Sequence, residues 1–382
     1  MPVVIFCRHH ILLDRGTSFW YIRYMKLGIV GLPNVGKSTL FNALTKLAAE
    51  VANFPFTTIN PNVGIVTVFD ERLEKLSKII PHEKLTFTTV EFVDIAGLVK
   101  GASKGEGLGN QFLSHIREVD GILHVVRCFE DENVVHVSGS VDPVRDVEII
   151  NTELLLADLE HVEKGFQKIQ KLLKTNNKKV FQEQDMLRKI KENLNKGIPV
   201  RLIKFEEHEA EFMTQYFFLT SKPMLYLANV SENKSPSVAK LVEKAKAENS
   251  EVVEIMSKLE LEMCSLSEEE CREFGKEYGI DEAGLKRLVK AAHSLLGLIT
   301  FFTVKEPEIR SWSIPANTKA PKAAGKIHSD MERGFISAEV INTDALLKIG
   351  SWSEARAKGA LALQGKEYTV KDGNVIQFRF GL

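Results

Sequence analysis

The chain has 382 residues, of which 44% are hydrophobic and 26% charged, and its formal net charge is −1. This length allows two or three domains with cores of their own, and the near-neutral charge excludes a chain-wide attraction to nucleic acid. Four cysteines without a C-x-x-C pair fit free thiols in a reducing cytoplasm, and no apolar run reaches the roughly 18 residues that cross a bilayer.

Residues 1–24 differ in character from the rest of the chain. The apolar run Val3–Phe6 is too short for a secretory signal, and no small-residue cleavage site comes after it. A strand-like segment begins directly after Met25. We therefore interpret residues 1–24 as the product of an upstream in-frame start or as a loosely attached extension.

The segment Gly31–Ser38 matches the phosphate-binding pattern G-x-x-x-x-G-K-[ST] without a gap. It lies between a strand-like run, Lys26–Val30, and a helical run, Thr39–Lys46. Its glycines let backbone N–H groups close on phosphate oxygens at the positive end of the new helix. We expect Lys37 to neutralise the β- and γ-phosphates of a nucleotide and Ser38 to ligate Mg²⁺. The residues expected to contact the nucleotide here are Asn34, Val35, Gly36, Lys37, Ser38 and Thr39.

Two later segments complete the predicted phosphate site. In Phe54–Thr58, we expect Thr58 to close on Mg²⁺ when a γ-phosphate is present; Thr57 is the alternative, and both are otherwise strand-edge hydroxyls. Asp94 follows a strand and gives a carboxylate for the Mg²⁺ hydration shell, and the N–H of Gly97 reaches the γ-phosphate. The glycine-rich stretch that begins at Gly97 is typical of an order–disorder switch.

Strands alternate with helices beyond Met25, which predicts a mainly parallel α/β sheet. The apolar strand candidates after Lys26–Val30 are Gly64–Val68, Thr89–Val93, Ile122–Val126, Met224–Ala228 and Val252–Met256.

A helical pattern interrupts these strands between Val126 and Met224. The first helix carries apolar residues at heptad spacing, and a second continues after an Asn176–Asn177 turn, which predicts an antiparallel helical hairpin. Residues 160–204 hold twelve Lys or Arg against five Asp or Glu. Such a run indicates either a solvated helix face or an electrostatic footprint for RNA phosphates. The seam residues are Leu155, Leu159, Val162, Phe166, Ile169 and Leu173, then Val180, Leu187 and Leu194.

The base-reading element comes directly after the strand at 224–228. Guanine-specific relatives carry N-K-x-D there, whereas this chain has Asn229-Val230-Ser231-Glu232. An Asp accepts guanine N1–H and the 2-amino group together, but Glu232 is one methylene longer, and Val230 replaces the lysine that stacks on the ring. Asn229 still meets the purine N7 edge. The element favours ATP over GTP, and a relaxed guanine site is the alternative.

These motifs together resemble the Obg-like ATPases, the YchF subfamily of translation-factor-class P-loop proteins. The resemblance covers the chain from Met25 onward, including Ala320–His328 and Tyr368–Gly373 near the end. It implies an α/β fold in three parts: a P-loop NTPase G domain with a mainly parallel sheet, an inserted coiled-coil hairpin, and a small C-terminal β-grasp (TGS) domain. The implied boundaries are a doubtful extension at 1–24, the G domain at 25–150 and 219–299, the insertion at 151–218, and the TGS domain at 300–382.

The resemblance also bears on catalysis. The residue after D-x-x-G is Leu98, where Ras-like enzymes have a glutamine that orients the attacking water, so another group must do this. His136 matches the histidine that the family uses as a catalytic residue, which implies that it positions the water or acts as a general base after loop movement; a surface or structural histidine is the alternative. Asn34 matches an asparagine that helps hold K⁺ in potassium-activated relatives. The predicted catalytic set is therefore Lys37, Gly97 and His136, with Mg²⁺ and, as a hypothesis, K⁺.

The C-terminal segment 325–341 is expected to run from a basic loop through a short helix into a strand, and Val375–Phe380 alternates as a half-buried strand. Five basic residues in and just before the segment 325–341 offer contacts to RNA phosphates, although nearby acidic residues reduce the local net positive charge. They are Lys319, Lys322, Lys326, His328 and Arg333.

The sequence thus predicts a slow, switch-like ATPase that binds ribosomes and RNA in the cytoplasm, as a monomer and without a membrane. A GTPase of the same architecture is the first alternative. A small-molecule phosphotransferase is the second, and a nucleic-acid-binding protein with a purely structural nucleotide is the third.

Overall fold

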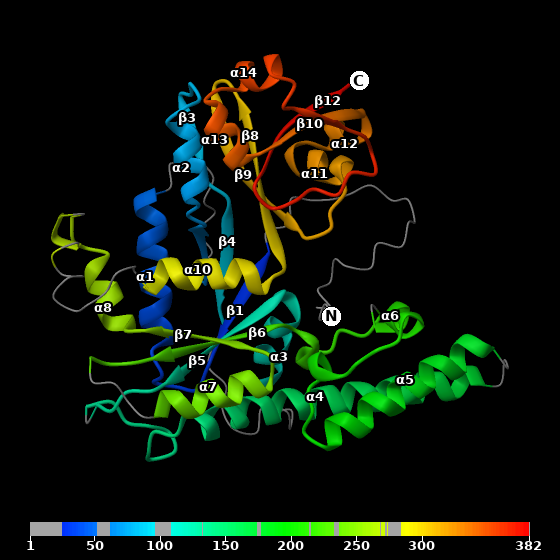
Figure 1. Ribbon diagram of the computed structural model, residues 1–382. Helices are drawn as coiled ribbons and strands as arrows, with labels where there is room; N and C mark the ends of the chain where they lie inside the picture. Colours follow the sequence, from blue (N-terminus) through cyan, green and yellow to red (C-terminus); the bar gives the residue numbers. More distant parts are fainter. Residues whose placement is uncertain are drawn as a thin grey trace. The chain divides into compact units, whose positions relative to one another are not determined.

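The computed structural model describes residues 25–51, 62–95, 108–131, 133–173, 177–213, 215–232, 237–267, 269–271, 273 and 284–381. The described chain forms two compact units, one from residues 25–64 and 91–292, the other from residues 65–90 and 293–381 (Figure 1). Each has its own sheet, and each is described separately below.

The first sheet has six strands in the order β2-β4-β1-β5-β6-β7. The pairs β1·β4, β1·β5, β5·β6 and β6·β7 are parallel, so the predicted mainly parallel α/β sheet is confirmed. All six predicted strands are present, with ends shifted by one residue at most. Their bounds are β1 Lys26–Val30, β2 Val63–Thr67, β4 Thr89–Asp94, β5 Gly121–Arg127, β6 Met224–Asn229 and β7 Glu251–Ile255.

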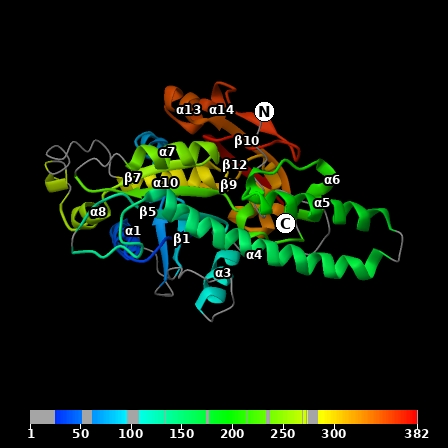
Figure 2. The same cartoon turned by 90° about the horizontal axis from the view of Figure 1, so that it is seen from below.

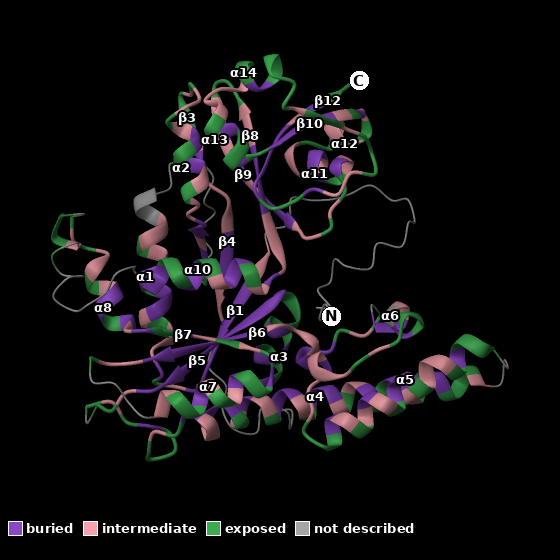
Figure 3. Ribbon diagram, in the orientation of Figure 1, coloured by how far each residue is buried: buried purple, intermediate pink, exposed green. Residues whose placement is uncertain are grey.

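The centre of this sheet is fully buried: every residue of β5 and β6 is buried, as Figure 3 shows in purple. Near-continuous apolar strands need helices on both faces, which the intervening segments supply. α7 packs against β6 and β7, and α4 packs against β5. The helices of this part of the chain are α1 Lys37–Val51, α3 Leu108–Glu118, α4 Pro143–Leu172, α5 Lys178–Asn195, α6 Glu207–Met213, α7 Ser237–Ala247, α8 Ser257–Met263 and α10 Gly284–Leu295, with 3-10 turns η3 Val200–Leu202 and η4 Leu219–Ser221.

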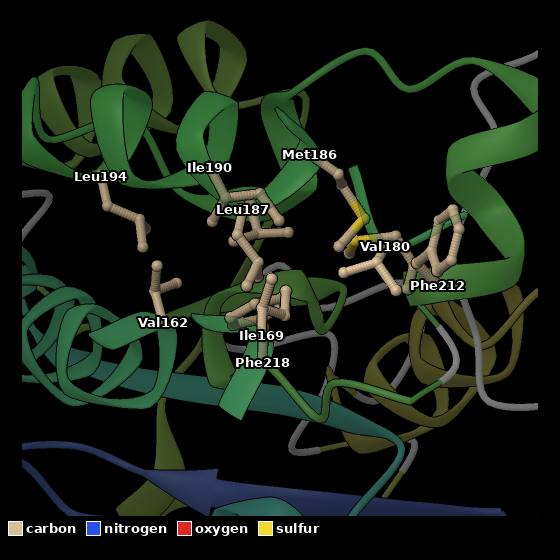
Figure 4. Close-up of a cluster of buried hydrophobic side chains, with 11 residues drawn as sticks. Val162, Ile169, Val180, Met186, Leu187, Ile190, Leu194, Phe212 and Phe218 are labelled. Atoms are coloured by element: carbon tan, nitrogen blue, oxygen red, sulfur yellow. The ribbon is translucent and has the colours of Figure 1, made fainter. Parts of the chain in front are cut away.

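α4 and α5 pack side by side and extend beyond the sheet (Figures 1 and 2). Asp142 caps α4, and Asn177 caps α5 through a hydrogen bond from the Lys179 N–H. All nine residues of the predicted seam belong to one apolar cluster between the helices. Figure 4 shows five of them, which are Val162, Ile169, Val180, Leu187 and Leu194. The cluster also takes in Phe212 from α6 and Phe218, which heptad spacing did not indicate.

The second sheet, in the order β11-β10-β12-β8-β9-β3, belongs to the other unit. Its β3 was not predicted; it lies in the segment expected to belong to the G domain and pairs in parallel with β9. One apolar cluster includes residues of α11, and another includes residues of α2, α13 and α14. The bounds are α2 Glu71–Ser77, β3 Lys84–Thr86, β8 Leu298–Lys305, β9 Glu308–Pro315, α11 Ala320–Ile327, α12 Ser329–Arg333, β10 Phe335–Asn342, α13 Thr343–Ile349, α14 Trp352–Ala357, β11 Ala362–Gln364 and β12 Asn374–Phe380.

The strand predicted at 375–380 is confirmed by β12, but the expected basic loop at Gly325 is wrong. That glycine lies inside α11, which starts with a proline in its first turn and buries Ala323 and Ala324. Proline suits a helix start because its missing N–H has no partner there in any case. Small apolar residues at helical spacing therefore outweighed the loop signal of the glycine.

His124 on β5 gives a stability prediction. It is 1% exposed, and its Nδ1 has no hydrogen-bond partner among the described residues. Burial, followed by the positive charges of Arg201 and Lys37, lowers the pKa of His124 from 6.5 to about 3. Stability from the neutral ring is therefore present above pH 6.5 and is lost as pH falls toward 3.

Between roughly pH 6.5 and pH 5, the wild-type chain should lose on the order of 2 kcal/mol more unfolding free energy than His124→Phe. Urea titrations of the nucleotide-free proteins at several pH values measure this difference. Identical pH slopes for the two proteins would contradict the assignment of a buried neutral ring.

Candidate nucleotide site

The phosphate loop joins β1 to α1 as the motif requires. β1 ends at Val30 and α1 begins at Lys37. Between them Asn34 and Gly36 have positive φ angles of 63° and 99°, and the Leu40 N–H donates to the Gly36 carbonyl at 3.0 Å. A left-handed residue just before a helix turns the chain so that successive N–H groups face the same space. The strand–loop–helix context predicted from the sequence is therefore confirmed.

The two motif glycines are required by close approach. A Cβ on Gly31 would lie 2.5 Å from the Val125 carbonyl oxygen of β5. A Cβ on Gly36 would lie 2.2 Å from Nδ2 of Asn229. Any side chain at these positions would push the loop away from the ends of β5 and β6.

Lys37 lies across the loop and close to Asp94. Its Nζ donates to the carbonyls of Gly31 and Leu32 at 2.9 and 2.8 Å. Burial lowers the pKa of Lys37 to about 8, and the charge of Asp94 opposes that shift. Burial likewise raises the pKa of Asp94, against the effect of Lys37. The structure thus brings together a cation and a carboxylate that lie 57 positions apart in the sequence.

Two of the three predicted Mg²⁺ ligands fall within the described residues. Ser38 is exposed in the first turn of α1, and Asp94 ends β4, beside Ile29 of β1. Thr58 lies outside the described residues, as does the predicted catalytic Gly97. A hydroxyl and a carboxylate near a phosphate loop are oxygen donors of the kind that Mg²⁺ prefers, with phosphate oxygens completing the shell. Among the described residues, no group of three or more His, Cys, Asp or Glu side chains forms a separate metal site.

Asn229 ends β6 and links the base-reading element to the phosphate loop. Its Nδ2 donates to the Val35 carbonyl at 2.9 Å, and its Oδ1 accepts from the Ser257 N–H at 3.1 Å. The side chain is 5% exposed. One N–H of the amide is left to meet a purine N7, so the expected base contact fits this geometry but shares the residue with a structural role.

The other two residues of the element lie further out. Val230 is half-buried, and its N–H donates to Ile255 of β7 at 2.9 Å. Glu232 is exposed. Val230 therefore places an apolar side chain at the position where guanine-specific relatives carry a stacking lysine. Glu232 places a carboxylate at the outer end of the element.

His136 is held between α4 and the phosphate loop, in the segment that comes after β5. The side chain is buried, and its Nε2 lies 2.8 Å from Oδ2 of Asp146. Because the Ser138 N–H donates to Nδ1 at 3.1 Å, the ring proton sits on Nε2 and is donated to Asp146. The preceding residue, Val135, accepts a hydrogen bond from Nδ2 of Asn34 at 3.1 Å. Both ring nitrogens of His136 therefore already have hydrogen-bond partners. The backbone of the same segment contacts the phosphate loop through Val135.

Asp146, the hydrogen-bond partner of the His136 ring, is the residue of this arrangement that the sequence did not indicate. It lies in the first turn of α4, is 1% exposed, and also accepts from Arg145. The only sequence signal was an acidic residue near a helix start, which is common because it favours the positive end of the helix dipole.

A cavity of about 200 Å³ lies elsewhere in the first unit, and none of the predicted site residues lines it. Its two cations, Arg201 and Lys244, both pair with Glu248. Since these charges are already neutralised, the cavity offers a poorer place for a triphosphate than the backbone amides of the phosphate loop.

The predicted RNA-binding surfaces are partly neutralised by local ion pairs. On the hairpin these are Lys164–Glu160, Lys179–Glu211, Arg188–Asp185, Lys189–Glu209 and Lys191–Glu163. In the C-terminal unit they are Lys319–Glu367, Lys322–Glu332 and Arg333–Asp330. The His328 ring lies 3.5 Å from the same Asp330 carboxylate, and burial lowers the pKa of Lys326. None of the helices in the described part of the chain is long and apolar enough to span a membrane.

Comparison with known proteins gives consistent matches over nearly the whole chain. A family model described as "50S ribosome-binding GTPase" matches residues 26–182. The YchF-GTPase_C model, described as "Protein of unknown function (DUF933)", matches residues 298–381. The "Ribosome-binding ATPase YchF" of Bacillus subtilis (strain 168) is 53% identical over 361 residues, which cover 93% of this chain and 99% of that protein. The protein of the same name from Haemophilus influenzae is 47% identical over 360 residues, 94% of this chain and 99% of its own length.

Two solved structures share the fold. The Schizosaccharomyces pombe YchF GTPase is 36% identical with a TM-score of 0.84, covering 93% of this chain and 97% of that one. A GTP binding protein from Pyrococcus horikoshii OT3 is 20% identical with a TM-score of 0.60, covering 94% and 100%. The second likeness concerns the fold alone.

The contact between Gly36 and Asn229 generates a binding prediction. Gly36→Ala should weaken binding of a non-hydrolysable ATP analogue by at least about tenfold, or 1.4 kcal/mol, because the new Cβ displaces the Asn229 amide. Calorimetry in the presence of Mg²⁺ measures the dissociation constant. The matched control is Gly350→Ala, at a glycine with the same φ of 99° and no atom within 4 Å of the new Cβ. An unchanged affinity in Gly36→Ala would contradict the role of this close approach.

Proposed function

The chain belongs to the YchF family, and we propose that it hydrolyses ATP to ADP and phosphate on the phosphate loop, with slow intrinsic turnover. The observation that carries this proposal is the geometry of residues 31–38. The loop presents its amides at the start of α1, and Lys37 lies beside Asp94. This arrangement suits a nucleoside triphosphate with its divalent cation, whatever the base.

We propose that Ser38, Thr58 and Asp94 hold the metal site, directly or through water. When bound there, Mg²⁺ neutralises charge that develops on the β- and γ-phosphates. Lys37 supplies the protein's own positive charge to the same oxygens, and the amides of residues 34–39 orient them. For K⁺, Asn34 retains a carbonyl oxygen, because its hydrogen bond to Val135 uses the amide nitrogen.

We propose that ATP is preferred to GTP because of the residues after β6. Glu232 does not reproduce the paired acceptance that an Asp gives guanine, and Val230 cannot stack as a cationic lysine does. The names of the bacterial relatives, which call them ATPases, support this preference. GTP is a second candidate, supported by the descriptions of the family model over residues 26–182 and of the Schizosaccharomyces pombe structure.

His136 is proposed to position the attacking water. In the resting arrangement its ring donates to Asp146 and accepts from Ser138, so it must be released from one of these contacts to reach the phosphates. The backbone beside the ring is tied to the phosphate loop, because Val135 accepts a hydrogen bond from Asn34. Hydrolysis is therefore slow until nucleotide or a partner favours turning the ring toward the phosphates while this backbone stays in place.

The family relation also supports a proposal about partners. We propose that the nucleotide state controls docking to the ribosome, as the names of the bacterial relatives suggest. RNA contact through the hairpin or the C-terminal unit is a finer proposal, and the local ion pairs on both surfaces weaken it. The domain boundaries, the coiled-coil and TGS assignments, the monomeric state and the cytoplasmic location stay predictions.

Hydrolysis assays on the purified chain test this function. We expect ATP turnover to exceed GTP turnover, ribosomes to accelerate it, and replacement of K⁺ by Na⁺ to slow it. Lys37→Ala should abolish it. Turnover that depends on a small acceptor and ignores ribosomes would instead indicate a phosphotransferase. No turnover with either nucleotide would leave a structural nucleotide site only.

The base preference has its own test. In Val230→Lys with Glu232→Asp, the ratio of ATP to GTP affinity should move toward GTP by about tenfold or more, which corresponds to roughly 1.4 kcal/mol. Competition binding with the two triphosphates measures the ratio. Glu251→Asp, an exposed acidic residue on β7, is the matched control and should leave the ratio unchanged. A double variant with the wild-type ratio would show that other residues choose the base.

A further inference from the structure

The end of β5 carries a buried arginine that the predicted nucleotide site does not include. Arg127 is 2% exposed and is the register partner of Asn229 on the neighbouring strand β6. Asn229 holds the phosphate loop from its strand end. Arg127, at the neighbouring strand end, reaches the segment that leads to His136.

The guanidinium of Arg127 donates to three backbone carbonyls of that segment. Nε reaches Phe129 at 3.1 Å, Nη1 reaches Val134 at 2.9 Å, and Nη2 reaches Asp131 at 3.3 Å. The guanidinium carbon also lies 4.6 Å from the centroid of the Phe129 ring. A planar fork with five N–H donors suits several carbonyls at once, whereas an ammonium is a single point charge. The described hydrogen-bond partners of Arg127 are carbonyls rather than carboxylates. The guanidinium therefore fixes the conformation of the backbone instead of neutralising a negative charge.

Polar contacts fix three consecutive residues of this segment. Arg127 holds the carbonyl of Val134, Asn34 holds the carbonyl of Val135, and Asp146 holds the ring of His136. Apolar packing contributes little, because Val135 and Val137 are 76% and 58% exposed. The position of His136 therefore depends on hydrogen bonds. Arg127 supplies one at Val134 and two more earlier in the segment, at Phe129 and Asp131.

We propose that Arg127 is a positioning residue for hydrolysis, which holds the segment 133–136 so that His136 is presented beside the phosphate loop. The inference rests on the proposed function, since it acts through His136. Each of the three guanidinium nitrogens of Arg127 already donates to a carbonyl, and the residue is 2% exposed, so it does not serve as a charge for the phosphates. Removing it should loosen the segment while leaving the loop 31–38 able to bind nucleotide.

The test combines Arg127→Met, which keeps length but removes every donor, with His136→Ala. Arg127→Met should lower kcat for ATP by about tenfold or more, while affinity for a non-hydrolysable ATP analogue changes by less than about threefold. In the His136→Ala background, Arg127→Met should change kcat by less than about twofold, because the two substitutions act on one unit. Amide exchange at residues 133–139 should accelerate by about tenfold or more in Arg127→Met, with α4 unchanged.

The controls separate this inference from general stability and from the proposed function. Arg201→Met removes another arginine of the same unit, one whose side chain is 9% exposed and pairs with Glu248, and should lower stability without changing kcat. Arg127→Lys keeps the positive charge but has a single donor group, so it should give an intermediate kcat. This variant replaces Arg127→Met in the test if Arg127→Met does not fold. Equal losses of kcat in both His136 backgrounds, or unchanged exchange at 133–139, would overturn the proposal. A wild-type chain that hydrolyses neither nucleotide would overturn the proposed function, and the exchange measurement would still decide on the positioning.

Discussion

The side-chain amide of Asn229 connects the phosphate loop to the ends of β6 and β7, and the rest of the nucleotide site is arranged around that contact. Its Nδ2 binds Val35 and its Oδ1 binds the Ser257 N–H. Gly36 must lack a Cβ for the amide to fit. A single buried carboxamide thus fixes the phosphate-binding turn relative to the element proposed to meet the base, and a nucleotide of fixed length would require such a fixed spacing.

The parallel sheet makes this arrangement possible. In such sheets ligands bind beyond the carboxyl ends of the strands, where loops from neighbouring strands meet. Here β1 leads into the phosphate loop, β4 ends in Asp94, β5 ends in Arg127, and β6 ends in Asn229. Each strand end carries one polar side chain or turn, and the buried apolar strands behind them supply rigidity. Hydrogen bonds to backbone carbonyls, more than ion pairs, hold the polar side chains at this edge in position.

Sequence patterns predicted the local parts of this structure well. The strands, the start of α1 and the heptad seam of α4 and α5 follow from periodicity and from the phosphate-loop motif, because these depend on neighbours along the chain. The pairing of β3 with β9, the Asn34–Val135 contact and the His136–Asp146 contact were not predicted. Each joins segments whose approach is decided by the folded topology, and no periodic signal marks the residues involved. Arg127 was missed for the same reason, since a lone arginine at a strand end has no sequence signature of burial.

The central claim is that a triphosphate is held by the backbone amides of residues 34–38 with its purine beside Asn229. A crystal structure of the chain with Mg²⁺ and a non-hydrolysable ATP analogue tests it most directly. We predict density for the β- and γ-phosphates on those amides, with Lys37 turned from the carbonyls of Gly31 and Leu32 toward the phosphate oxygens. Phosphates found elsewhere, such as in the cavity beside Arg201 and Lys244, would contradict the account.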